Sequence, residues 1–291
     1  MLLQHLFNAK CIDYPHQRDE RPERRNKRQA AILSEMFDGS NVLMKKVAFR
    51  NIEFLMLLNN SGHDLATMSS LFDIGIYEKS TTIFIANYLK NGDTFIDVGA
   101  NNGYFSLLAA GIVGSTGRII SIEPQSESYA RLVKNIQINN IRNIVPFRLS
   151  ASNTTQSMSI FFPEGGSGLT SMLNNKVGLH SEKVMAYPLD LLIKDSYLNN
   201  KTIIKIDVEG YEHEVLQGAS NLICQNDIVI VFEYFKYAIF NRNRKYDSVI
   251  DYLHNMNFEI HLLSNDGSLG KIIRNHLEIP YLVTNLVAIK R

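Results

Sequence analysis

Cysteine is scarce in this sequence, with only two among 291 residues. Cys11 and Cys224 lie far apart and match no metal-binding or redox spacing, so each is interpreted as an ordinary thiol. This usage indicates a reducing compartment, and we expect a cytoplasmic protein. The opening residues, MLLQHLFNAK, are too short for a signal peptide and lack a cleavage-like site, so none is expected.

Long uncharged apolar runs are also absent, so the sequence predicts no membrane-spanning segment. The formal net charge is only +1, which provides no overall field to attract nucleic acid or an anionic membrane. The arginine-rich stretch 16–28 is interleaved with acidic residues and favours a solvated linker or helix face over a nucleic-acid-binding segment. Nucleic acid is therefore disfavoured as a partner.

The length of the chain fits one large domain with an accessory region. We predict a mainly helical N-terminal extension of unassigned function over residues 1–75, and a second domain over residues 76–291. Within the extension, residues 49–58 are strongly apolar, and their periodicity does not separate a strand from a short helix.

Short apolar segments alternate with amphipathic segments from residue 80 onward. This alternation predicts an α/β fold with a doubly wound, mostly parallel sheet, whose ligands bind where the strands end. The predicted strands are 94–98, 118–122, 144–149, 202–207, 228–232, 258–263 and 282–289. The predicted helices are 80–90, 104–112, 127–139, 211–217 and 246–256.

A small β insertion interrupts the alternation. Residues 157–162 and 183–188 are expected to be strands, separated by a loop that begins with the glycine-rich residues 163–170. Such a hairpin or small sheet beside the cofactor suits a substrate lid, and a plain surface excursion is the alternative.

A glycine turn links the strand 94–98 to the helix that follows, within the sequence NGDTFIDVGANNG at 91–103. Glycine permits positive φ and a close approach of a ligand, and the helix start offers free N–H groups. The next strand ends in Glu123 and Pro124, about 20 residues after Gly103, where an acidic residue binds ribose hydroxyls in nucleotide folds.

The dinucleotide pattern G-x-G-x-x-G is missing, because Asn101 stands where the second glycine would be. This favours a cofactor with adenosine but no phosphate, such as S-adenosylmethionine, held by the turn and by Glu123. An NAD-dependent enzyme of similar winding is disfavoured by the missing glycines. A turn that merely packs the helix on the strand is the plain structural alternative.

Four carboxylates end successive strands, which predicts a site at one edge of the sheet. These are Asp97, Glu123, Asp207 and Glu233. Asp207 is interpreted as functional, because an unpaired carboxylate after apolar neighbours is costly unless it is bound or solvated. Methyl transfer to a hydroxyl benefits from a base, and the candidates are Asp207, Glu209, His213 and Glu233.

Two of these assignments have alternatives. Histidine titrates near neutrality, which favours a base, but His213 follows Glu209 by one helical turn and fits a surface pair as well. A divalent metal between Asp207 and Glu233 lacks a clear third ligand, so we predict no metal site.

Several segments together resemble the FkbM-type methyltransferases, over residues from about Gly75 to about Leu263. They are DVGANNGYFSLLAA, the IEP after the second strand, KNIQINNIRNIVPFRLSAS, YPLDLLI, KIDVEGYEHEVLQGA and VFEYF. The resemblance implies a class I, Rossmann-like, S-adenosylmethionine-dependent O-methyltransferase, often acting on sugar or polyketide hydroxyls. Two departures are Asn102 and Asn153, where an apolar residue and an aspartate would be expected.

The resemblance and the glycine turn together imply a set of site residues. The cofactor-binding residues expected are Asp97, Gly99, Asn101, Gly103, Glu123, Pro124, Ser150 and Ala151. The resemblance also implies a catalytic neighbourhood at Asp207 and Glu209. The predicted function is methylation of a hydroxyl on a saccharide or secondary metabolite. The alternative is a non-catalytic module that binds an adenosyl ligand and recruits a partner through residues 1–75.

Overall fold

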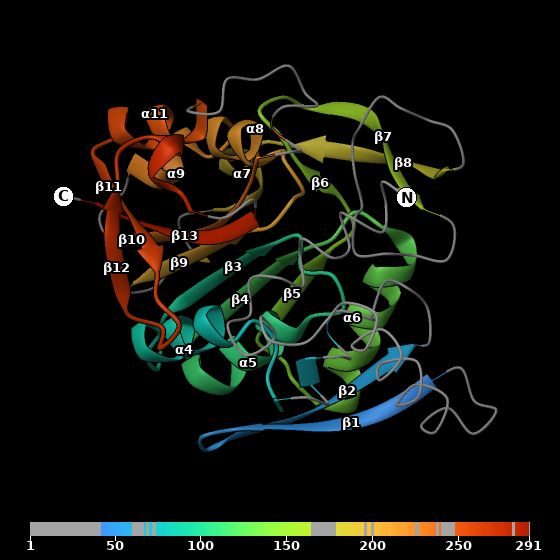
Figure 1. Ribbon diagram of the computed structural model, residues 1–291. Coiled ribbons are helices and arrows are strands. Elements are labelled where there is room, and N and C mark those ends of the chain that lie inside the picture. The colour runs from blue at the N-terminus through green and yellow to red at the C-terminus, as the bar shows by residue number, and fades with distance from the viewer. Residues whose placement is uncertain are drawn as a thin grey trace, which may run out of the picture.

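A sheet of eight strands forms the centre of the protein in this computed structural model (Figure 1). The structure describes residues 42–59, 67, 70–71, 74–163, 179–194, 197–198, 201–224, 227–236, 239, 248–280 and 283–290. The strands lie in the order β12-β11-β13-β10-β9-β3-β4-β5. Their bounds are β3 Thr94–Val98, β4 Arg118–Ile122, β5 Ile144–Phe147, β9 Thr202–Ile206, β10 Ile228–Phe235, β11 Phe258–Leu263, β12 Leu269–Ile273 and β13 Val283–Lys290.

The pairing confirms the doubly wound, mostly parallel sheet that the alternation predicts. Strands β5, β4, β3, β9 and β10 pair in parallel, whereas β13 runs antiparallel between β10 and β11. Strands β3, β9 and β10 are buried along their whole length, as expected for central strands covered on both faces.

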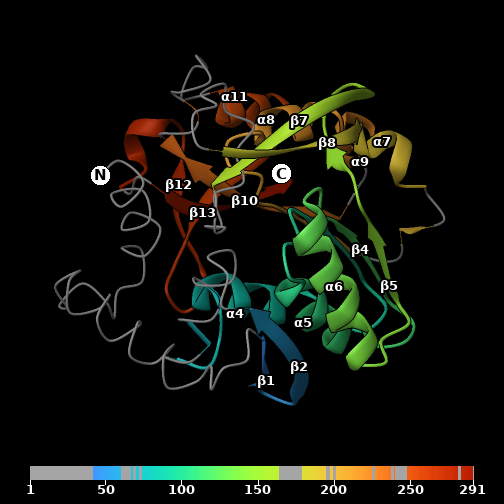
Figure 2. The same ribbon diagram turned by 90° about the vertical axis from the view of Figure 1, so that its right-hand side faces the viewer.

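Helices cover both faces of the sheet, and each face has its own hydrophobic core (Figures 1 and 2). One core includes α4, α5 and α6, and the other includes α7, α8, α9 and α11. The bounds are α4 Lys79–Tyr88, α5 Tyr104–Val113, α6 Ser126–Ile138, α7 Leu189–Leu192, α8 Glu212–Gln217, α9 Ser220–Cys224 and α11 Ser248–Asn255. A short 3-10 helix, η3, spans His276–Glu278.

The predicted insertion is a separate three-stranded sheet. Strands β6 (Ser150–Ala151), β7 (Gln156–Pro163) and β8 (Leu179–Tyr187) lie in the order β6-β8-β7. Glu182 of β8 accepts hydrogen bonds from the backbone N–H and the hydroxyl of Ser126, at 3.0 and 2.6 Å, at the first residue of α6. The insertion is thereby fixed beside the helix that follows Glu123. Residues 164–170 of the predicted glycine-rich loop lie outside the described residues.

An antiparallel hairpin corrects part of the prediction for the N-terminal extension. Strands β1 (Val42–Phe49) and β2 (Ile52–Asn59) replace the helical character expected there, so the apolar run at 49–58 is mostly strand. The hairpin lies against α5 and α6 (Figure 2). The N–H groups of Leu55 and Leu57 in β2 donate to the side chains of Asn139, directly after α6, and Asn135, within α6, both at 2.7 Å.

Several described elements have no counterpart among the predicted ones, namely β1, β6, α9, β12 and η3. The arginine-rich stretch 16–28 lies outside the described residues. No helix in the described part of the chain has the length and apolar character needed to cross a membrane.

Candidate functional site

The glycine turn between β3 and α5 contacts both Glu123, a predicted cofactor residue, and the backbone of Asp207, a predicted catalytic residue. Gly99 has φ +84°, and a Cβ atom there would lie 2.0 Å from the backbone oxygen of Asp207. The residue must be glycine because the chain leaving β9 passes this close. Asn101 has φ +50°, and its N–H donates to the Glu123 carboxylate at 2.8 Å. The turn therefore joins the end of β4 to the end of β9 at one edge of the sheet.

Glu123 is buried directly after β4, with 6% of its surface exposed. Its two carboxylate oxygens accept hydrogen bonds from the N–H groups of Asn101, at 2.8 Å, and Gln125, at 2.9 Å. Burial raises the pKa of Glu123 to about 7, although these two hydrogen bonds oppose the shift. A carboxylate has about four acceptor sites, so further hydroxyl donors can be accommodated.

Asp97 is a second buried carboxylate beside the turn. One oxygen, Oδ2, accepts a hydrogen bond of 2.6 Å from the Ser106 hydroxyl on α5. The other, Oδ1, is buried and has no hydrogen-bond partner among the described residues. Burial raises the pKa of Asp97, opposed by Lys205 and Ser106. A buried acceptor without a partner is rare in folded proteins and suits a cationic or N–H ligand group.

These observations fit S-adenosylmethionine on three counts. The turn is shaped by glycines, since Gly103 also has positive φ, +92°, at the start of α5. Glu123 has acceptor capacity for ribose hydroxyls, and Asp97 for the ammonium of the methionine end. Among the other predicted cofactor residues, Pro124 follows Glu123 in the loop before α6, and Ser150 and Ala151 form β6.

The two departures from the family pattern make contacts of their own. Asn102 is buried, and its backbone oxygen accepts a 2.8 Å hydrogen bond from Asn135 of α6. The side-chain amide of Asn153 donates to Gln217 of α8 at 2.8 Å.

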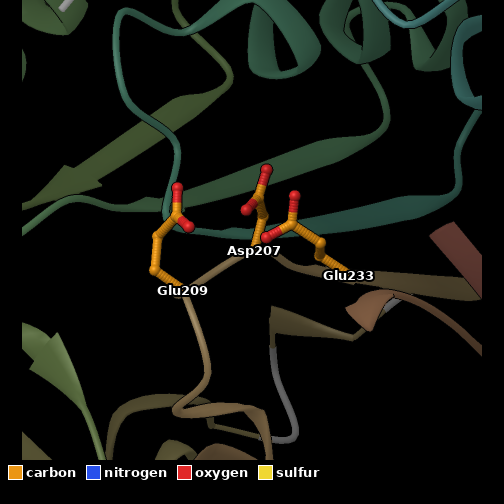
Figure 3. A group of neighbouring side chains, drawn as sticks. All are labelled: Asp207, Glu209 and Glu233. Atoms are coloured by element: carbon orange, nitrogen blue, oxygen red, sulfur yellow. The ribbon is translucent and has the colours of Figure 1, made fainter. Parts of the chain in front are cut away.

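Three carboxylates converge at the end of β9 and on β10 (Figure 3). Asp207 follows β9, Glu209 lies in the turn after it, and Glu233 is on β10. One oxygen from each of the three lies within 4.8 Å of the others. Glu209, predicted as a catalytic residue, thus supplies the third possible metal ligand that the sequence analysis did not find beside Asp207 and Glu233. Oxygen ligands of this kind suit Mg²⁺, and their negative charge also suits proton acceptance.

A fourth carboxylate, which sequence reasoning missed, holds the turn that carries Glu209. Glu209 and Gly210 both have positive φ, +57° and +91°. The Glu212 carboxylate at the start of α8 accepts hydrogen bonds from the N–H groups of Val208, at 3.2 Å, and Gly210, at 3.1 Å. Burial raises the pKa of Glu212 to about 7. An acidic residue in the first turn of a helix is the signal that could have identified it.

Lys205 corrects the expectation that Asp207 is an unpaired carboxylate. Its ammonium lies 3.1 Å from Oδ2 of Asp207, and the lysine is buried near the carboxyl end of β9. Lysine is almost never fully buried unless it is paired, so a lysine inside the apolar run TIIKI was the available signal. The cost of placing Asp207 after apolar residues is therefore reduced by an internal partner.

His213 does not join the three carboxylates. Its ring packs edge-on against Tyr252 of α11, with the ring centroids 5.6 Å apart. It is absent from the group of convergent ligand atoms found among the described residues. Its catalytic role remains a prediction, whereas Asp207, Glu209 and Glu233 are brought together.

Comparison with known proteins adds evidence independent of this geometry. The model of the methyltransferase FkbM domain matches residues 97–260, which is more than half of the chain. The chain belongs to the FkbM methyltransferase family. The matched segment contains the glycine turn, Glu123 and all three convergent carboxylates. The resemblance in the sequence is thus confirmed, together with the Rossmann-like fold of class I methyltransferases.

Individual relatives of this FkbM methyltransferase are more distant. The hexuronic acid methyltransferase AglP of Haloferax volcanii is 28% identical over 143 residues, covering 49% of this chain and 56% of the relative. The match thus spans little more than half of that curated relative.

Two solved structures are similar to the chain at low identity. The methyltransferase FkbM of Methylobacillus flagellatus KT has 16% identity and a TM-score of 0.47, covering 91% of this chain and 59% of its own. An S-adenosylmethionine-dependent O-methyltransferase of Thermotoga maritima has 11% identity and a TM-score of 0.44, covering 89% and 96%.

Proposed function

We propose that this protein is a cytoplasmic, S-adenosylmethionine-dependent methyltransferase that methylates a hydroxyl group of a saccharide. The observation that carries the proposal is the contact of one glycine turn with both Glu123 and the backbone of Asp207. A cofactor seated on this turn would lie beside Asp207, whose carboxylate groups with those of Glu209 and Glu233. Membership of the FkbM family supports methyl transfer as the reaction.

The residues of the chain divide into two roles. Glu123 and Asp97 would hold the ribose and the ammonium of the cofactor, and Asn101 and the glycines shape the turn between them. When bound, S-adenosylmethionine supplies an electrophilic methyl group on a sulfonium centre. The acceptor hydroxyl must lose its proton as it is methylated, and the Asp207, Glu209 and Glu233 group offers the base.

The grouped carboxylates of Asp207, Glu209 and Glu233 favour methylation of a neutral acceptor group. Two like charges 4 Å apart repel by about 4 kcal/mol at the effective dielectric near a protein surface. Three converging carboxylates would therefore disfavour a carboxylate as the methylated group and favour a hydroxyl. A saccharide acceptor is supported by the relative from Haloferax volcanii, whose name describes a hexuronic acid methyltransferase. In a uronic acid, we expect a hydroxyl to be methylated rather than the carboxylate.

Calorimetry with S-adenosylmethionine tests the cofactor site. We expect the wild type to bind, Glu123→Ala to bind at least about tenfold more weakly, and Glu127→Ala to match the wild type. Glu127 is a suitable control because it lies nearby on α6, half exposed, in an ion pair with Arg131. Undiminished binding by Glu123→Ala would contradict the assigned cofactor site.

A panel of neutral glycosides and glycuronosides tests the acceptor. Mild alkali cleaves a methyl ester and leaves a methyl ether intact, so the product identifies the methylated group. We expect alkali-stable products, formed at least about 100-fold more slowly by Asp207→Asn and by Glu209→Gln. Cofactor binding without methylation of any acceptor would favour the non-catalytic adenosyl-binding module. Intact turnover in both variants would show that other residues are catalytic.

A further inference from the structure

Lys205 lies behind the carboxylate group, in the interior of the sheet. It is 3% exposed, on a strand in which all five residues are buried. Its ammonium is 3.1 Å from Oδ2 of Asp207 and 4.6 Å from the centre of the Phe105 ring on α5. In the parallel pairing of β9 with β3, Lys205 lies opposite Asp97. One cation therefore stands between the predicted cofactor carboxylate and the predicted catalytic group.

The surroundings keep Lys205 charged. Burial disfavours the ammonium, but the carboxylates of Asp207, Glu78 and Asp97 outweigh this effect and hold the pKa of Lys205 above its ordinary value. Glu78 precedes α4, where it also accepts a 2.8 Å hydrogen bond from Asn285 of β13. The ammonium of Lys205 is thus held against Asp207 by opposite charge.

The geometry suggests what this charge does. Asp207, Glu209 and Glu233 place three oxygens within 4.8 Å, an arrangement opposed by mutual repulsion. A fixed ammonium beside Asp207 offsets part of that repulsion. It also holds one oxygen of Asp207, which restricts the direction of the carboxylate. Burial on β9 gives the ammonium little freedom to move.

We propose that Lys205 is a positioning residue of the methyltransferase, which offsets part of the negative charge of the three carboxylates and fixes the direction of Asp207. This inference rests on the proposed function and adds a residue to it. Lys205 acts through Asp207, since its ammonium is bonded to that carboxylate and lies beneath it in the strand.

A double-mutant cycle of Lys205→Met and Asp207→Asn tests the proposal. Lys205→Met is expected to lower kcat about 100-fold, the lower end of the contribution of a positioned acid or base. In the Asp207→Asn background the same substitution should change kcat by no more than about twofold, because its target is already removed. Lys271→Met is the control, because Lys271 is exposed and pairs with Glu278 at the surface.

Three outcomes would overturn the proposal or separate it from the proposed function. Additive losses in the cycle, or a kcat for Lys205→Met within about twofold of the wild type, would show that Lys205 does not act through Asp207. If Lys205→Met does not fold, Asp207→Asn is compared with the double variant, since neither has an unbalanced buried carboxylate at position 207. A further loss of kcat of more than about twofold in the double variant would then overturn the proposal. Calorimetry with S-adenosylhomocysteine is run in parallel. Absence of binding by the wild type would contradict the proposed function. Binding and turnover that Lys205→Met leaves unchanged would contradict only the role of Lys205.

Discussion

Replacement of Glu123 by glutamine should change how the stability of the protein depends on pH. The pKa of Glu123 rises from 4.5 to about 7 on folding, so the folded protein holds the proton more tightly than the unfolded chain. The stabilisation by this group is complete below pH 4.5 and is lost as the pH rises through 7. At about 1.4 kcal/mol per pH unit, Glu123 accounts for a loss of roughly 3 kcal/mol of unfolding free energy between those limits.

Urea unfolding from about pH 5 to about pH 8 measures this loss. Glu212 contributes a loss of the same sign, because burial raises its pKa to about 7 as well. Glu123→Gln should therefore reduce the fall in stability with pH without abolishing it. Glutamine also mismatches one of the two backbone donors at the site, which lowers stability by about 1–3 kcal/mol at every pH. The wild type and Glu123→Gln are therefore compared by the slope of unfolding free energy against pH, with Glu127→Gln as the control.

The same carboxylate links pH to cofactor binding. Hydroxyl donors favour the ionised form, so S-adenosylhomocysteine should bind more tightly as the pH rises through about 7, with release of a proton. Calorimetry in buffers of different ionisation enthalpy measures that proton. A slope of stability against pH that is the same in the wild type and Glu123→Gln, together with binding that is independent of pH, would refute this reasoning.

Three further predictions concern the turn, the hairpin and metal ions. Gly99→Ala should lower the unfolding free energy by about 3 kcal/mol, because its Cβ would meet the Asp207 backbone oxygen at 2.0 Å. The control is Gly75→Ala, which has φ +78° but open space around it and should lower the unfolding free energy by only about 1–2 kcal/mol. Equal losses for the two variants in urea titrations would contradict the close approach at Gly99. Asn135→Ala should lower the unfolding free energy by about 2 kcal/mol and speed amide hydrogen exchange at Leu57, since the Asn135 side chain bonds to the backbone of both Leu57 and Asn102. Unchanged exchange at Leu57 would contradict the role of Asn135 in holding the hairpin. Removal of divalent ions with EDTA should leave turnover within about twofold, because Lys205 already offsets part of the charge of the carboxylates. A loss of turnover that Mg²⁺ restores would identify the carboxylates as metal ligands.

The sheet and the glycine turn could be predicted from sequence because their signals are local. Short apolar strands alternate with amphipathic helices, and Asn101 and the glycines mark a turn that needs positive φ. The positions of Asp207, Glu209 and Glu233 follow from topology, since parallel strands end at one edge. These features depend only on residues close together in the sequence, or on the rule that parallel strands end at the same edge of the sheet.

The hairpin and the supporting residues required contacts that sequence patterns do not display. Residues 42–59 form a hairpin, and two N–H groups of its β2 strand donate to asparagines more than 70 residues later in the chain, Asn135 of α6 and Asn139 directly after it. A lysine inside an apolar strand indicates that it has a partner, but the sequence pattern does not name Asp207 as that partner. Glu212 acts on the backbone of its own turn, which residue spacing alone does not reveal.

A crystal structure with S-adenosylhomocysteine tests the central claim most directly, because it places the cofactor relative to both groups of carboxylates. The account predicts ribose hydroxyls bonded to Glu123, with the sulfur facing Asp207, Glu209 and Glu233 across the glycine turn. A ligand bound elsewhere, or one whose sulfur points away from these three carboxylates, would contradict it.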